Sequence, residues 1–308
     1  MRAGSPAMIA PGLPRWLRAI FRVKAVAFVA MASWSTAFAQ QPQQPSGGDN
    51  LGLELVDPKV LRVCSDPANM PFSNEHGEGF ENKIAELVAA KVGKRLAYTW
   101  YPQSTGFVRQ TLGSFRCDVI MGFPQGNDLV ESTNPYYRSV YALVLKDGSP
   151  LAGVDALGDQ RLRGKRIGIV AGTPPSNYLV ADGLMATAKP YPLVVDTRFD
   201  SVGRAMTKDI ASGEVDAGIL WGPIAAWFAR QAQPPLRIVP LLKEGGGPSL
   251  AYRITMGVRP TDQNWRRQLN GVIRAIEPDI TRILLSYGVP LLDDSGHIKT
   301  GEPAAVKP

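Results

Sequence analysis

Histidine and cysteine are scarce in this chain. Its 308 residues include two histidines, His76 and His297, and two cysteines, Cys64 and Cys117. Residues so far apart in sequence do not supply the closely spaced ligand pairs of a zinc site. No Ser-His-Asp or Cys-His arrangement is visible, which disfavours nucleophilic catalysis. We therefore expect no metal, no cofactor and no catalytic residue.

Long apolar runs are also missing after the first 40 residues. There, a basic stretch ending at Lys24 precedes the apolar Ala25–Ala32 and the small-x-small sequence Ala37-Phe38-Ala39. This order is typical of a cleaved secretory signal. A transmembrane anchor is less favoured, because a bilayer requires roughly 20 apolar residues. We expect cleavage after Ala39 and a mature, periplasmic protein with no membrane span.

Positive charge is in small excess. The formal net charge of +7 includes five basic residues in the signal region and no acidic residue there, which leaves +2 for the mature chain. So weak a balance gives no reason to expect binding to nucleic acid or to an anionic membrane.

The two cysteines are an even number in an exported chain. Both lie at predicted strands that could be neighbours in one sheet. An oxidising compartment therefore favours a disulfide between Cys64 and Cys117. Two buried free thiols, behaving as small apolar residues, are the alternative.

Strand-like and helix-like segments alternate along the mature chain. Two successive βα sets predict mostly parallel sheets with helices on both faces. The predicted strands are residues 61–65, 96–100, 118–121, 165–170, 193–195, 217–220 and 252–258. The predicted helices are residues 84–92, 107–112, 177–185, 202–210, 223–229 and 264–287, the last interrupted by Pro278.

A chain of this length suits two lobes better than one core. Turn-rich, polar breaks near residues 146–150 and 245–248 mark the crossings between them. The predicted organisation is a signal peptide (1–39), a flexible tether (40–56), a first lobe (57–146 plus 250–292), a second lobe (147–249) and a C-terminal tail (293–308).

Several short motifs occur in a fixed order over residues 60–288. They include Pro71-Phe72, Gly79-Phe80-Glu81, Cys117-Asp118-Val119-Ile120, Ala171-Gly172-Thr173 and a run at 212–217. The ordered set resembles type II periplasmic solute-binding proteins of ABC transporters. This resemblance implies an α/β fold of two lobes, each a mostly parallel sheet flanked by helices, with a cleft between them.

A narrower set of matching segments comprises residues 63–74, 79–85, 98–100, 106–112 and 135–139. It is similar to the branch associated with PQQ-dependent quinoprotein methanol and alcohol dehydrogenases, the J proteins of methanol dehydrogenase gene clusters. The resemblance implies a non-catalytic periplasmic partner of the dehydrogenase, acting in its maturation or activation. We expect the protein to be a monomer.

Two positions depart from the amino-acid-binding pattern of the wider family. Those relatives carry an Arg after the third strand for the ligand carboxylate, but residues 122–129 contain none. They also carry an Asp after a strand of the second lobe for the ligand ammonium, where this chain has Trp221-Gly222-Pro223. Each charge-assisted bond lost costs about 1.5–3 kcal/mol. An ordinary amino acid is therefore disfavoured as ligand.

Candidate ligand-binding residues follow predicted strands, because open α/β sheets bind ligands at the carboxyl ends of their strands. Asp66 and Asn69 could contact a ligand or cap their own turn. Thr173 could hold an anion or cap a helix, and the aromatic residues could stack on a ligand or pack in the core. The full set is Asp66, Asn69, Phe72, Phe123, Gln125, Thr173 and Trp221.

Three acidic residues near glycines, Glu75, Glu78 and Glu81, lack the compact spacing of a calcium site. We interpret them as part of a solvated loop. Two other functions stay open. An ABC-transporter receptor for a small solute would need a closable pocket with convergent polar groups. A dehydratase of the cyclohexadienyl kind would need an acid–base pair in the cleft, such as one including Asp66 or Glu78.

Overall fold

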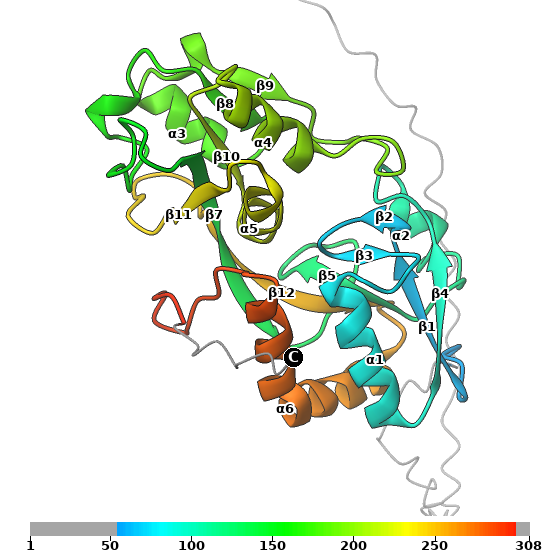
Figure 1. Cartoon of the computed structure of the whole chain (residues 1–308). Coiled ribbons are helices and arrows are strands. Elements are labelled where there is room, and N and C mark those ends of the chain that lie inside the picture. Colours follow the sequence, from blue (N-terminus) through cyan, green and yellow to red (C-terminus); the bar gives the residue numbers. More distant parts are fainter. Residues whose placement is uncertain (1–53, 300–308) are drawn as a thin grey trace, which may run out of the picture. The chain divides into compact units, whose positions relative to one another are not determined.

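The computed structural model describes residues 54–299 (Figure 1). The expected signal peptide, most of the tether and the last nine residues lie outside that range. The described strands are β1 (Val60–Ser65), β2 (Ala68–Asn69), β3 (Ser73–Asn74), β4 (Arg95–Trp100), β5 (Val119–Pro124), β6 (Glu131–Ser132), β7 (Tyr137–Lys146), β8 (Ile167–Val170), β9 (Lys189–Tyr191), β10 (Ala217–Trp221), β11 (Leu236–Pro240) and β12 (Ala251–Val258). The described α-helices are α1 (Phe80–Val92), α2 (Phe107–Gln110), α3 (Pro175–Ala181), α4 (Val202–Ser212), α5 (Gly222–Gln231) and α6 (Gln263–Ser286).

Two groups of parallel strands form the centres of two lobes. In the first lobe, β4, β1 and β5 are parallel, and β12 pairs antiparallel to β5. In the second lobe, β10, β8 and β9 are parallel. Parallel strands need crossover helices, which matches the βα alternation of the sequence. The expected two-lobed α/β fold is confirmed.

Strand β7 belongs to both lobes. Its first residues pair with β12 of the first lobe, from Tyr137 to Val140. Its remaining residues pair with β10 and β11 of the second lobe, from Tyr141 to Lys146. Figure 1 shows this long strand running from one lobe into the other. The antiparallel strands β7 and β11 were not predicted from the sequence, which shows only the parallel βα units.

Apolar side chains cover both faces of each sheet. In the first lobe, α1 and α6 pack together over one face, where Phe80, Ile84 and Leu269 are fully buried. The other face carries a smaller cluster around Phe107 of α2. In the second lobe, α3 covers one face and α4 with α5 the other. Sheets buried on both faces explain the continuous apolar strands of the sequence.

Two predicted elements are wrong. Residues 193–195 do not form a strand; the neighbour of β8 is Lys189–Tyr191, where Tyr191 is buried. Leu193 and Val194 are instead more than half exposed, so apolar character there does not reflect a core position. Pro278 does not interrupt α6, which continues to Ser286. Buried Ile276 and Ile280 on either side of Pro278 anchor the helix, which outweighs the missing N–H.

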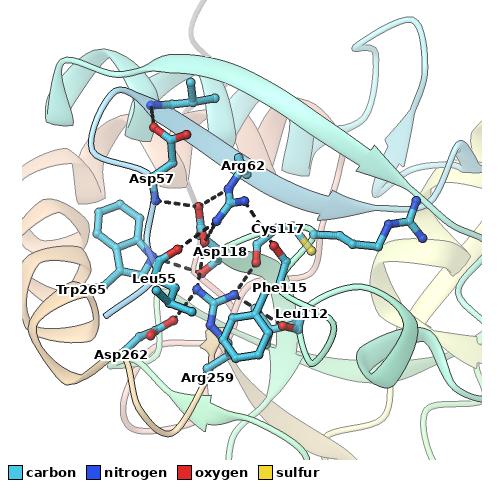
Figure 2. A network of polar contacts seen from close by, with 12 residues as sticks. Leu55, Asp57, Arg62, Leu112, Phe115, Cys117, Asp118, Arg259, Asp262 and Trp265 are labelled. Carbon is cyan, nitrogen blue, oxygen red and sulfur yellow. Dashed lines mark hydrogen bonds and ion pairs between the residues drawn. The ribbon is translucent and has the colours of Figure 1, made fainter. Parts of the chain in front are cut away.

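A buried charge network fastens the ends of the first lobe's elements (Figure 2). The side chain of Asp118, just before β5, is fully buried and accepts hydrogen bonds from Arg62 Nε at 2.7 Å and Arg259 Nη2 at 2.9 Å. Arg259, just after β12, also forms an ion pair with Asp262. Trp265 of α6 donates its indole N–H to the Asp118 carbonyl. β1, β5, β12 and α6 are therefore all connected through Asp118.

Candidate functional site

Two adjoining cavities lie between the lobes. Their volumes are about 450 and 430 Å³. We call the larger the loop cavity, because residues 193–204 form much of its wall, and the smaller the aromatic cavity. Phe72, Gln103, Tyr141, Leu193 and Trp221 line both. Tyr141 comes from β7, the strand that the lobes share.

The loop cavity receives Asn69 from the first lobe and Thr173 from the second. Asn69 donates from Nδ2 to Oε1 of Gln103 at 2.8 Å. The Thr173 hydroxyl donates to the Val170 carbonyl at 2.6 Å, as does its backbone N–H at 3.3 Å. Both Thr173 donors are thus used within its own turn. Thr173 does not cap α3, whose N-cap position is Pro174 and carries no side-chain cap bond.

Asp66 connects the two lobes. Its side chain is buried behind the cavity walls, and its carboxylate accepts from the backbone N–H groups of Ala68 and Gln103. The hydroxyl of Thr197, in the segment between β9 and α4, donates to the same carboxylate at 2.8 Å. In Figure 1 this segment of the second lobe extends to β2 of the first. The carboxylate therefore closes one end of the cleft with a hydrogen bond between lobes.

The aromatic cavity is enclosed by rings set at steep angles to one another. The ring centres of Tyr141 and Trp221 are 5.3 Å apart at 66°, and those of Trp221 and Tyr252 are 5.9 Å apart at 74°. Tyr141 and Tyr252 are 6.5 Å apart at 73°. Phe72 and Tyr137 add further walls. Three mutually tilted rings form three sides of a cage.

Glu81 lines the same cavity. It lies in the first turn of α1, on the face that also carries Ile84, Ala85 and Val88, all fully buried. Its carboxylate rests on β5 where residue 122 is glycine; a Cβ there would lie 2.0 Å from Glu81 Oε1. Burial, with the negative charge of Asp66 as a second cause, raises the pKa of Glu81 to about 8. The interpretation of Glu81 as part of a solvated loop was wrong.

Phe123 and Gln125, expected in the cleft, lie elsewhere. Successive residues of a strand point to opposite faces, so Gly122 and Pro124 reach the aromatic cavity while Phe123 faces away from it. Phe123 packs in the cluster of α2, together with the bonded pair Cys64–Cys117. Gln125 is exposed beyond the end of β5. Of the predicted aromatic residues, Phe72 and Trp221 line both cavities.

Within residues 54–299, no three His, Cys, Asp or Glu side chains are grouped closely enough to hold a metal ion. None of the helices in that range combines the length and apolar character needed to cross a membrane.

Comparison with known proteins defines the class. Residues 61–288 match the family of bacterial extracellular solute-binding proteins, family 3, and the chain belongs to this family. The fold is that of the periplasmic binding proteins.

Individual relatives show which members of the family the chain is similar to. The chain is 44% identical to the periplasmic binding protein XoxJ of Methylobacterium extorquens AM1; the match covers 76% of this chain and 100% of that crystal structure, with a TM-score of 0.65. It is 28% identical to Protein MoxJ of Methylorubrum extorquens over 77% of this chain and 83% of the relative. The Protein MoxJ of Paracoccus denitrificans is 29% identical, and the match covers 78% of this chain and 92% of that relative. The chain is thus similar to the J proteins of methanol dehydrogenase clusters.

Proposed function

We propose that this protein is a non-catalytic periplasmic partner of a PQQ-dependent methanol or alcohol dehydrogenase, acting in its maturation or activation. The observation that carries the proposal is the similarity to J proteins, which extends over the whole of the XoxJ crystal structure at 44% identity. A likeness spread over both lobes supports a shared role better than a match confined to one motif.

The residues of the cleft also disfavour an ordinary amino acid as the ligand. Trp221 stands where the amino-acid-binding relatives place an acidic residue, and it forms a wall of both cavities. The loop cavity is lined by Arg198 and Arg204, but Arg198 is already paired with Asp196 at 2.6 Å. A ligand carboxylate that approached Arg198 would have to compete with this pair.

Size-exclusion chromatography of residues 40–308, mixed with the quinoprotein dehydrogenase of the same organism, tests the proposal. We expect co-elution at low salt with the apo or the PQQ-loaded enzyme, weakened by added salt if surface charges guide the encounter. The variant Glu81→Gln should co-elute equally, because residue 81 lies inside the cleft.

Separate elution with both forms of the enzyme would contradict the proposal. It would favour the second candidate, an ABC-transporter receptor for a small solute, which the two cavities between the lobes support. Turnover in a dehydratase assay would contradict both candidates, since each is a binding protein without catalysis.

A further inference from the structure

The aromatic cavity pairs one carboxylate with a set of aromatic faces and no basic partner. None of the described residues that line it is Lys, Arg or His, and its ionisable carboxylate is Glu81. Aromatic faces carry partial negative charge, so they attract cations and repel anions. A second carboxylate, that of Asp66, lies close enough to act on Glu81 electrostatically. The charged group among the described residues that line this cavity is therefore a carboxylate.

The rings are arranged to surround a ligand rather than to stack on it. Tyr141, Trp221 and Tyr252 all line the cavity, and their ring planes are inclined to one another by 66–74°. A flat ligand is best held between parallel rings, whereas a round, apolar cation contacts several tilted faces at once.

We propose that the aromatic cavity binds a small quaternary ammonium cation, with Glu81 as its counter-ion and Tyr141, Trp221 and Tyr252 as its cage. This site goes beyond the proposed partnership with a dehydrogenase and does not depend on it.

The small number of hydrogen-bond acceptors in the cavity favours a quaternary ammonium over a primary amine. A primary ammonium group has three N–H donors to satisfy. Besides Glu81 and the tyrosine hydroxyls, the cavity offers the Gln103 amide oxygen, which already accepts from Asn69. A quaternary ammonium has no N–H donor, and its methyl groups gain from apolar contact. Unmet donors would weaken a primary amine relative to its trimethylated form.

Glycine 122 is part of the site. Any Cβ at this position would collide with the Glu81 carboxylate, so Gly122→Ala keeps the charge but displaces it. Glu81→Gln keeps the shape but removes the charge. The two substitutions separate the position of the carboxylate from its presence, and Glu86→Gln, on the exposed side of the same helix, serves as matched control.

Isothermal titration calorimetry of the mature protein with choline tests the site. Its neutral carbon analogue, 3,3-dimethylbutan-1-ol, has the same shape without the charge. We expect choline to bind at pH 9 with a Kd below about 1 mM and the neutral analogue about tenfold or more weakly. Glu81→Gln should lose about tenfold in choline affinity, Gly122→Ala should also bind less tightly, and Glu86→Gln should match the wild type.

The pH dependence gives a second readout. The titratable groups that interact with Glu81 are Asp66 and three tyrosines, Tyr98, Tyr136 and Tyr137, whose own pKa values are raised by burial. The tyrosines therefore stay neutral at pH 9, and choline carries its charge at every pH. Choline affinity should rise from pH 6 to pH 9 as Glu81 ionises, and Glu81→Gln should lose this rise.

Three results would overturn the proposal: no choline binding at pH 9, equal binding of the neutral analogue, or wild-type affinity in Glu81→Gln. If Glu81→Gln fails to fold, Tyr252→Leu, which removes one wall at a half-buried position, provides the test and should weaken choline more than the neutral analogue. A failure here leaves the chromatography with the dehydrogenase unaffected, so the two proposals can fail separately.

Discussion

Asp118 and Glu81 are two carboxylates of the same lobe with opposite surroundings. Asp118 is fully buried, yet two arginines, Arg62 and Arg259, donate to it. Glu81 faces aromatic rings and the charge of Asp66, with no basic residue among the described lining of its cavity. The first arrangement is self-contained, because each charge has its partner. The second is incomplete, and an incomplete charge at a cavity is a feature of binding sites.

The largest effect is expected at the self-contained carboxylate. Asp118→Asn should lower the free energy of unfolding by about 3–5 kcal/mol, because it leaves Arg62 without its counter-charge and Arg259 with Asp262 alone. Urea denaturation at pH 7 measures the loss. Asp159→Asn, which removes an exposed partner of Arg161, should cost far less, because ion pairs at the surface contribute little to stability. Equal losses in the two variants would show that burial of the Asp118 network contributes nothing.

Glu81→Gln should raise the free energy of unfolding, whereas Asp118→Asn lowers it. The pKa of Glu81 is 4.5 in the unfolded chain and about 8 in the folded one, so the folded state binds the extra proton between these values. Wild-type stability is therefore complete below about pH 4.5 and is lost as the pH rises through 8. A neutral glutamine does not ionise, so the variant keeps this stability at high pH. It should be more stable than wild type by about 1–3 kcal/mol at pH 8.5, a range that is discounted for the partial exposure of residue 81.

Thermal or urea unfolding at pH 5 and pH 8.5 checks this prediction. The two proteins should differ little at pH 5 and diverge at pH 8.5. A constant difference across this range would mean that Glu81 is already ionised at pH 5, and would remove the contrast with Asp118.

The smallest effect concerns Asp66, which is bound by neutral donors. Thr197→Val removes its hydrogen bond from the second lobe and should cost about 1 kcal/mol. Amide hydrogen exchange should become faster in residues 192–201. Thr187→Val, which loses a hydroxyl bond within the second lobe, should not change exchange there. Unchanged exchange in Thr197→Val would show that this bond does not hold the lobes together.

Much of the fold follows from local patterns. The βα alternation predicted both parallel groups, because each strand and helix has its own apolar periodicity. Strand β7 was not predicted, although Val140–Leu145 is a continuous apolar run. What the sequence does not show is that this strand pairs in both lobes, because its partners, β10, β11 and β12, lie 71 or more positions later.

The residues of the candidate site were harder to predict from the sequence than the fold was. Phe72 and Trp221, chosen by the rule for strand ends, line both cavities. The same rule does not say which face of β5 residue 123 takes. Glu81 carried a usable signal: it stands three, four and seven residues before Ile84, Ala85 and Val88, on the buried stripe of α1. A charged residue on such a stripe indicates a special environment. The cage itself joins β7, β10 and β12, and only tertiary structure brings them together.

The first lobe is completed late in synthesis, because strand β12 and Arg259 come from the C-terminal part of the chain. Arg259 follows Asp118 by 141 positions, while the strands of the second lobe, β8 to β11, are made in between. A ribosome therefore finishes the second lobe's strands before it supplies the arginine, the strand and the helix that complete the first. Removal of residues 251–286 would accordingly damage the lobe that begins the chain and spare the strands of the lobe next to the cut.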